Sequence, residues 1–272
     1  MVSVGIDIGG STTKIVGFDA ERNLMAPILI KATDPITSIY GALGRFTFEN
    51  GLALTDIREL MVTGVGSSYV EDSLYDRPCS HLNEFECIGR GGLYLSGLDK
   101  AIIVSMGTGT ALVYAENSGK CEYLGGTGVG GGTLMGLSRQ MLGTDDIRSI
   151  TKLAAEGDIN KVDLKITDIT ADDDDGLSLP DSMTAANFGK VSDMAEKADI
   201  ALGIINMIFE TIGMMAVFAA RQHGIRDVVL TGSLSTIPQA KHCFDVFNRM
   251  FDMNFIIPEN SQFGTVIGAA LN

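Results

Sequence analysis

The sequence predicts an α/β protein of two similar lobes that face a central cleft. A chain of 272 residues has the length of about two domains of roughly 150 residues each. A short β-rich run that ends in glycine opens the chain and recurs at Ala101. Each copy is followed by further strand and helix patterns, which is typical of an α/β architecture. We therefore expect an N-terminal lobe over residues 1–98 and a C-terminal lobe over residues 99–272.

The first lobe begins with two strands joined by a glycine turn. Apolar side chains alternate from Val2 to Ile8, and a second β-branched run, Thr12 to Phe18, follows the pair Gly9-Gly10. This pattern predicts a hairpin. The other elements expected in this lobe are a helix from Ile36 to Asn50, a strand from Leu60 to Gly64 and a helix from Leu82 to Leu93.

The second lobe repeats this opening. A strand from Ala101 to Met106 runs into a Gly-Thr-Gly-Thr turn and returns from Ala111 to Ala115, and a glycine-rich loop from Gly125 to Gly136 follows. A segment with so many glycines is typical of a backbone that approaches a ligand or another segment closely. The remaining expected elements are helices at Leu134–Leu142, Glu196–His223, Ile237–Met250 and Phe263–Leu271, and strands at Asp227–Gly232 and Phe255–Ile257.

Charge and composition exclude several classes of partner. Lysine and arginine number 20 against 34 aspartate and glutamate residues, a net charge of −14, which repels nucleic acid and anionic lipid. The most apolar run, Ile200 to Ala220, is interrupted by Asn206 and Glu210, and no export signal is visible near Met1. We therefore expect a cytoplasmic protein that contacts neither nucleic acid nor membrane.

Metal-binding patterns are weak in this sequence. The four cysteines form no CxxC pair, which indicates free thiols rather than a zinc site or disulfides. The acidic run Asp172–Asp175 lacks the interleaved spacing of a calcium loop, so we interpret it as a solvated surface loop.

Two glycine hairpins carry the groups that the phosphates of a nucleotide require. The first supplies a carboxylate for Mg²⁺, N–H donors, hydroxyls and a cation. Its candidate residues are Asp7, Gly9, Gly10, Ser11, Thr12, Thr13 and Lys14. The second offers the same chemistry at Thr108 and Gly109. The Walker A pattern is absent, and an ordinary surface turn would explain either hairpin alone, but the pair predicts two turns that meet around one triphosphate.

The glycine-rich loop offers a third phosphate-binding feature. Where it enters a helix, unpaired N–H groups and the helix dipole would favour an anion. Gly126, Gly128 and Gly131 also resemble a dinucleotide fingerprint, although the acidic partner of that motif is not evident. Gly232-Ser233 would let a base or ribose lie between two elements.

Four segments in this order, DIGGSTTK, VSMGTGT, VVLTGS and FGTVIGAA, resemble the phosphate and adenosine motifs of the actin, hexokinase and Hsp70 ATPase superfamily. Within it, NEFEC, GGTGVGGGTLMGL, LAAEGDINKVDLKITDI and TAANFGK resemble the type II pantothenate kinases. The resemblance implies two ribonuclease-H-like lobes of the actin-like ATPase fold with a central nucleotide cleft. It also implies ATP-dependent phosphorylation of pantothenate, the first step of coenzyme A biosynthesis, by a homodimer joined through long C-terminal helices.

The resemblance also implies a role for each matching residue. Glu84, in the short E-F motif, would be the general base for the pantothenate hydroxyl. Asp7 would hold Mg²⁺, directly or through water. The residues implied to contact ATP are Lys14 and Thr108 at the phosphates, Gly131, Gly132, Thr133, Leu134 and Met135 along the nucleotide, and Ser233 near the adenosine.

One position departs from the family pattern. The arginine with which family members contact pantothenate falls on Tyr123, and a neutral phenol cannot replace a guanidinium opposite a carboxylate. Either another residue, such as Arg90 or Arg139, makes that contact, or the acceptor is another small hydroxyl compound. Two other functions remain open: an ATPase switch such as the iron–sulfur activators of 2-hydroxyacyl-CoA dehydratases, and an inactive regulator that senses nucleotide or acyl-CoA.

Overall fold

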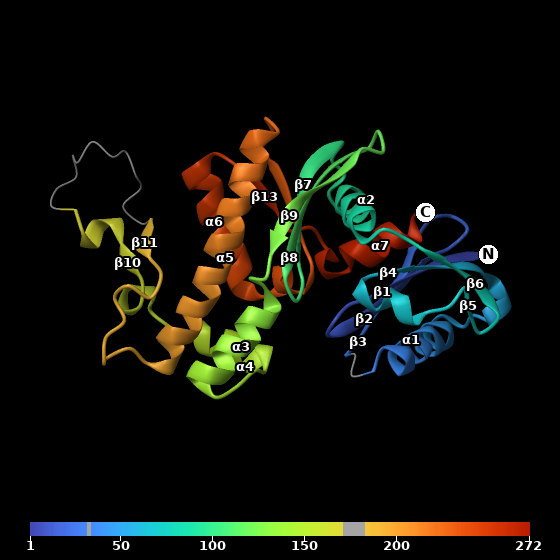
Figure 1. The fold of residues 1–272 in the computed structure, drawn as a ribbon, viewed down its shortest axis with the longest axis horizontal. Coiled ribbons are helices and arrows are strands. Elements are labelled where there is room, and N and C mark those ends of the chain that lie inside the picture. Colours follow the sequence, from blue (N-terminus) through green and yellow to red (C-terminus); the bar gives the residue numbers. More distant parts are fainter. Residues whose placement is uncertain (32–33, 171–182) are drawn as a thin grey trace.

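The computed structural model describes residues 1–31, 34–170 and 183–272. These residues form two large β-sheets with helices packed against them, and a third, two-stranded sheet at one end of the molecule (Figure 1). The expected two-lobed α/β fold is confirmed. The predicted acidic loop, Asp172–Asp175, lies outside the described residues.

The first sheet has the strand order β3-β2-β1-β4-β6-β5. Its strands are β1 (Val2–Ile8), β2 (Thr12–Phe18), β3 (Leu24–Lys31), β4 (Ile57–Thr63), β5 (Ser73–Leu74) and β6 (Arg77–His81). β1 pairs antiparallel with β2 and parallel with β4. Helix α1 (Pro35–Asn50) packs on β2 and β3. It begins at Asp34, whose carboxylate accepts the N–H of Thr37 at 2.7 Å, and ends at Gly51 in the left-handed conformation.

The second sheet, with the order β13-β12-β7-β8-β9, repeats this arrangement. Its strands are β7 (Lys100–Met106), β8 (Thr110–Glu116), β9 (Cys121–Thr127), β12 (Asp227–Thr231) and β13 (Asn254–Ile256). Its helices are α3 (Gly131–Leu142), α4 (Ile147–Ala154), α5 (Lys197–Gln222) and α6 (Pro238–Phe251). The antiparallel set β7-β8-β9 and the parallel pair β7-β12 correspond to β1-β2-β3 and β1-β4. The repeat seen in the sequence is therefore a repeat of the sheet topology.

Two helices, α2 (Glu84–Ser96) and α7 (Gly264–Ala270), lie between the large sheets (Figure 1). Their backbones touch where glycines meet: a Cβ on Gly91 would lie 1.7 Å from the carbonyl oxygen of Gly264, and one on Gly268 would lie 1.9 Å from that of Cys87. α2 packs on β7 and β8, whereas α7 packs on β1 and β2. The helix pair thus connects the lobes, and the division at residue 98 stays a prediction.

Helix α5 is long and apolar enough to cross a membrane, judged by length and composition alone, and it is the one such helix in the part of the chain that is described. Its most apolar window has a mean hydropathy of 1.9. In the fold, 56% of that window is buried, and the helix packs against α3, α4, α6 and the second sheet. Its apolar character is that of a core helix, although the residues Asn206 and Glu210 within it predicted no apolar run of membrane-spanning length.

The third sheet, formed by β10 (Leu164–Lys165) and β11 (Thr184–Ala186), is tied to α5 by a buried carboxylate. Asp163 is fully buried and accepts hydrogen bonds from the Asn206 side chain and the Phe188 N–H, both at 2.8 Å. The TAANFGK segment therefore serves at least as an anchor between this sheet and α5.

Candidate functional site

The two predicted hairpin turns face each other at the carboxyl ends of parallel strands. β1 and β4 end at the first turn, and β7 and β12 end at the second. A Cβ on Gly10 would lie 3.8 Å from the hydroxyl oxygen of Thr108, so the turns of the two lobes lie about one side chain apart. Gly10, Ser11 and Thr108 are exposed. Open α/β sheets bind ligands at such strand ends.

Three ionisable side chains gather beside the first turn. Asp7 and Lys14 are cross-strand partners that are 8% and 7% exposed. Burial raises the pKa of the Asp7 carboxyl, and the Lys14 charge partly offsets this. Burial lowers the pKa of Lys14, and the negative charges of Asp7 and Glu84 partly offset this by raising it. Burial also raises the pKa of Glu84, with a further contribution from Asp7 and an opposing one from Lys14. The predicted magnesium ligand, phosphate contact and general base thus act on one another electrostatically.

The start of α2 fixes the position of Glu84. Asn83 is the N-cap residue, and its side-chain oxygen accepts the N–H groups of Phe85 at 2.9 Å and Glu86 at 3.3 Å. Glu84 is therefore the first residue of the helix and is half-buried, whereas Glu86 is exposed. The cap fixes where the helix begins, and residues two positions apart in a helix point to different sides. The Glu84 and Glu86 carboxylates therefore lie on different sides of the first turn.

Two glycines end equivalent strands beneath the hairpins. Gly64 follows β4 with φ 88°, and Gly232 follows β12 with φ 86°. A Cβ on Gly64 would lie 2.6 Å from Oδ1 of Asp7, and one on Gly232 would lie 2.5 Å from the Met106 carbonyl oxygen. Both positions require glycine for conformation and for space. Gly64 was not among the predicted site residues. The Thr-Gly pair that ends both strands, Thr63-Gly64 and Thr231-Gly232, could have shown that the two glycines are equivalent.

The glycine-rich loop packs against the second hairpin. Its first residues belong to β9, and α3 begins at Gly131 rather than at Leu134. The N–H groups of Gly131 and Gly132 donate to the carbonyl oxygens of Gly107 and Thr108, both at 2.8 Å. The expectation that these N–H groups are unpaired is therefore wrong, because the neighbouring turn already accepts their hydrogen bonds.

The other residues predicted to contact phosphates differ in burial and in hydrogen bonding. The Gly9 N–H donates to the Thr12 carbonyl at 2.9 Å and closes the first turn, and Gly109 accepts the Gly107 N–H at 2.8 Å in the second. Thr13 is fully buried, and its hydroxyl has no hydrogen-bond partner among the described residues.

The predicted nucleotide-lining residues also take different environments. Leu134 is buried in the core of the second lobe, whereas Met135 is exposed. The Thr133 hydroxyl donates to the Gly128 carbonyl at 2.9 Å. Ser233 opens a short 3-10 helix directly after Gly232. Whether these residues contact a nucleotide stays a prediction.

Tyr123 lies against the residue that follows Glu84. Its ring stacks on Phe85 with centroids 4.0 Å apart and planes at 21°. The sequence singled out Tyr123 as a departure from a family pattern, but it offered no sign of this stacking partner, because β9 and α2 are far apart along the chain.

The two arginines considered as substitutes have other partners. Arg90 hydrogen-bonds to the Asn272 side chain, and Arg139 forms an ion pair with Asp145. Among the described residues, Lys14 is the one cation that acts on the pKa of the predicted base.

The carboxylates beside the first hairpin suit Mg²⁺. This ion binds proteins through one or two carboxylates and completes its coordination with phosphate oxygens and water. Asp7 supplies a buried carboxylate whose raised pKa a cation would lower, and it lies close enough to the half-buried Glu84 to raise the pKa of that carboxyl. No group of three or more His, Cys, Asp and Glu side chains that could hold a metal occurs in residues 1–31, 34–170 and 183–272. The site therefore fits a cation that arrives with phosphates.

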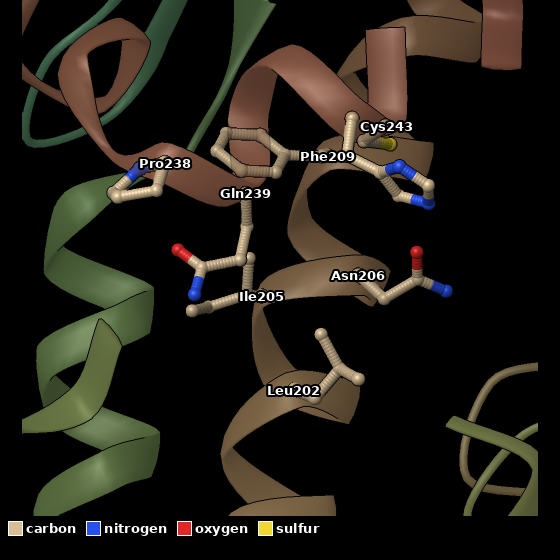
Figure 2. Close-up of a pocket in the computed structure, with 8 residues that line it drawn as sticks. Leu202, Ile205, Asn206, Phe209, Pro238, Gln239 and Cys243 are labelled. Atoms are coloured by element: carbon tan, nitrogen blue, oxygen red, sulfur yellow. The ribbon is translucent and has the colours of Figure 1, made fainter. Parts of the chain in front are cut away.

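A separate pocket lies between α5 and α6 (Figure 2). Its volume is about 240 Å³, and its lining residues are Leu202, Ile205, Asn206, Phe209, Pro238, Gln239, His242 and Cys243. None of them is a predicted site residue, so this pocket is distinct from the predicted site at the two hairpins.

Solved structures share this fold over the whole chain. The activator of the 2-hydroxyisocaproyl-CoA dehydratase from Clostridium difficile, with bound ADPNP, matches with a TM-score of 0.71 at 20% identity, covering 100% of this chain and 93% of that one. A ROK family glucokinase from Streptomyces griseus, in complex with glucose and AMPPNP, matches with a TM-score of 0.62 at 12% identity, covering 99% and 98%. The chain therefore has the two-lobed actin-like ATPase fold.

Sequence comparison identifies the family within that class. Residues 100–251, more than half of the chain, match the Fumble family. A type II pantothenate kinase from Staphylococcus haemolyticus is 28% identical over 98% of both chains. The chain belongs to the Fumble family, that of the type II pantothenate kinases, and is a kinase. The resemblance inferred from the sequence motifs is confirmed.

Proposed function

We propose that this kinase transfers the γ-phosphoryl group of ATP to the hydroxyl of pantothenate, giving 4′-phosphopantothenate and ADP. The observation that carries the proposal is the meeting of the two glycine hairpins beside Glu84. The choice of acceptor is supported by the names of the curated relatives.

In this proposal the chain's own groups position and activate the acceptor. Glu84 accepts the proton of the hydroxyl while the hydroxyl oxygen bonds to the γ-phosphorus and the bond from that phosphorus to the bridging oxygen of ADP breaks. Its raised pKa makes it a better base than an ordinary carboxylate. Lys14 and the hydroxyls of Ser11, Thr12 and Thr108 contact the phosphates. These contacts align the γ-phosphoryl group and neutralise its charge, which are the main requirements of phosphoryl transfer.

Magnesium fits the same proposal. Asp7 would hold it, directly or through water, and the ion would neutralise phosphate charge. The homodimer, which the resemblance implies, is a further part of the proposal. So are the cytoplasmic location, expected from charge and composition, and the lobe boundary at residue 98, expected from the internal repeat. Light scattering, cell fractionation and limited proteolysis would test them.

The proposal is tested by incubating the purified protein with Mg·ATP and a panel of small hydroxyl compounds while ADP release is measured. We expect pantothenate or a close analogue to be phosphorylated. Glu84→Gln should lower kcat by about 100-fold or more, because it removes the base but keeps the shape. Glu86→Gln is the matched control on the same helical turn and should retain activity. Equal effects of the two variants would remove Glu84 from its proposed role.

A different acceptor is the second candidate, since Tyr123 offers no positive charge. Turnover of another alcohol with none of pantothenate would favour it. An iron–sulfur switch is less well supported: burial raises the pKa of the Cys79 and Cys87 thiols to about 11, and metal binding requires thiolates. An iron-free preparation would exclude that function, and nucleotide binding without any turnover would instead indicate a regulator.

A further inference from the structure

A stacked aromatic pair borders Glu84 on the side of β9. Phe85 and Tyr123 stack at 4.0 Å, and Tyr123 remains 48% exposed. The Cys121 Sγ contacts the Phe85 carbonyl oxygen at 3.3 Å, which fastens β9 to the start of α2. The Tyr123 hydroxyl lies next to Gly126, where a Cβ would be 3.1 Å away. The pair is therefore held in place on one side and open on the other.

The charges beside this pair are mainly acidic. Glu84 and Glu86 flank Phe85 along α2. Lys14 is buried, and Asp7 stands opposite it. Arg90, one turn beyond Glu86, acts electrostatically on Cys121 and hydrogen-bonds to Asn272. An anionic group on the aromatic pair would meet like charges, in a chain whose net charge is −14.

We propose that Tyr123 and Phe85 form the acceptor platform and that the platform favours an acceptor with a neutral amide at the end remote from its hydroxyl over one with a carboxylate there. This inference rests on the proposed function and refines its substrate class. A flat amide gains contact area on an aromatic face. A carboxylate in the same place gains no ion pair with the platform and is repelled by Glu84 and Glu86. Tyr123 thereby determines specificity without touching the reacting atoms.

The test compares kcat/KM for pantothenate and for its N-propylamide, which has the same hydroxyl and no carboxylate. We expect the wild-type protein to favour the amide by about fivefold or more, the effect of one partly exposed charge interaction. Tyr123→Arg should shift the ratio toward the carboxylate by about fivefold, chiefly through KM, because the guanidinium supplies the missing cation. Tyr123→Phe keeps the stack and should keep the wild-type ratio.

Tyr94→Arg is the matched control. Tyr94 is also an exposed tyrosine, 45% exposed, that contacts a phenylalanine edge to face, and its replacement should leave the ratio unchanged. A calorimetric titration with Mg·ATP verifies that each variant is folded. A wild-type preference for the carboxylate, or an equal shift in both arginine variants, would overturn the platform alone. Nucleotide binding without phosphorylation of either compound would overturn the proposed function as well.

Discussion

At the scale of single residues, Asp7, Lys14 and Glu84 set one another's charge. Burial acts against the ionised form of each, and the opposite charges of their neighbours act in its favour. Lys14 is the central member, because it lowers the pKa of both carboxyls. The arrangement suits a site that binds nucleotide with its metal, because Mg²⁺ would stabilise the carboxylates and phosphate would stabilise the ammonium.

The pH dependence of the reaction follows from these charges. A base acts only when deprotonated, so kcat/KM should fall as the pH drops through the pKa of Glu84. Burial and Asp7 raise that pKa, so the fall should occur above the ordinary value of 4.5. Lys14→Met removes the charge that lowers the pKa and should move the fall to still higher pH. The measurement is a pH profile at saturating Mg·ATP.

Lys14→Arg serves as the control for this profile, since it keeps the charge and should stay near the wild-type midpoint. A midpoint that Lys14→Met leaves in place would contradict the electrostatic coupling, even if activity fell for other reasons.

At the scale of elements, each lobe contributes one strand–hairpin–strand unit and one strand that ends in Thr-Gly. The glycine at that end lets the chain turn under the hairpin: Gly64 lies against Asp7, and Gly232 lies against Met106. A 3-10 helix follows each of them. The equivalence explains why the two turns approach each other from opposite lobes.

Gly64→Ala should destabilise the protein by about 2 kcal/mol or more. It adds a strained positive φ to collisions with the Asp7 carboxylate and the Ile8 carbonyl oxygen, each 2.6 Å from the new Cβ. Displacement of Asp7 should also weaken Mg·ATP binding. Urea unfolding and calorimetry measure the two effects.

Gly119→Ala separates strain from collision. Gly119 has φ 96°, yet a Cβ added there would have no atom within 4 Å, so only the conformational cost of about 1 kcal/mol applies. Nucleotide affinity should stay at the wild-type level. Equal losses of stability in both variants would show that the collisions at Gly64 are unimportant, and unchanged Mg·ATP affinity in Gly64→Ala would contradict the role of Asp7.

The sequence predicted elements with strong local signals and missed those defined by pairing. The hairpin strands β1, β2, β7 and β8 were expected within about a residue of their observed ends. The strands β3 and β9 were missed; both lie at sheet edges, β3 contains Pro27, and β9 contains Gly125 and Gly126. Such residues have low strand preference, and only pairing with a neighbouring strand makes them extended.

The same limit applied to the site. Spacing along the chain predicted that both hairpins would carry phosphate-binding groups, and the structure brings Gly10 and Thr108 together. It could not predict that the N–H groups of Gly131 and Gly132 bond to the second turn, since this depends on how closely the loop approaches. The stack of Tyr123 on Phe85 likewise follows from tertiary packing alone.

At the scale of the whole molecule, the predicted base belongs to the junction of the lobes. Glu84 begins α2, which packs on the second sheet, while α7 packs on the first and the two helices share a glycine contact. The carboxylate is therefore placed by both lobes at once. A change in the crossing of α2 and α7 should therefore displace Glu84.

Gly91→Ala tests this dependence. Its Cβ would lie 1.7 Å from the Gly264 carbonyl oxygen, so α2 and α7 must move apart, at a cost of about 3 kcal/mol. Because Glu84 moves with α2, kcat should fall along with the melting temperature. Gly44→Ala is the matched control in α1, where no atom lies within 4 Å of the new Cβ; it should stabilise the protein by about 0.5–1 kcal/mol through helix propensity. If Gly91→Ala lowered the melting temperature but left kcat intact, the base would be positioned by the start of α2 and its Asn83 cap, independently of the lobe junction.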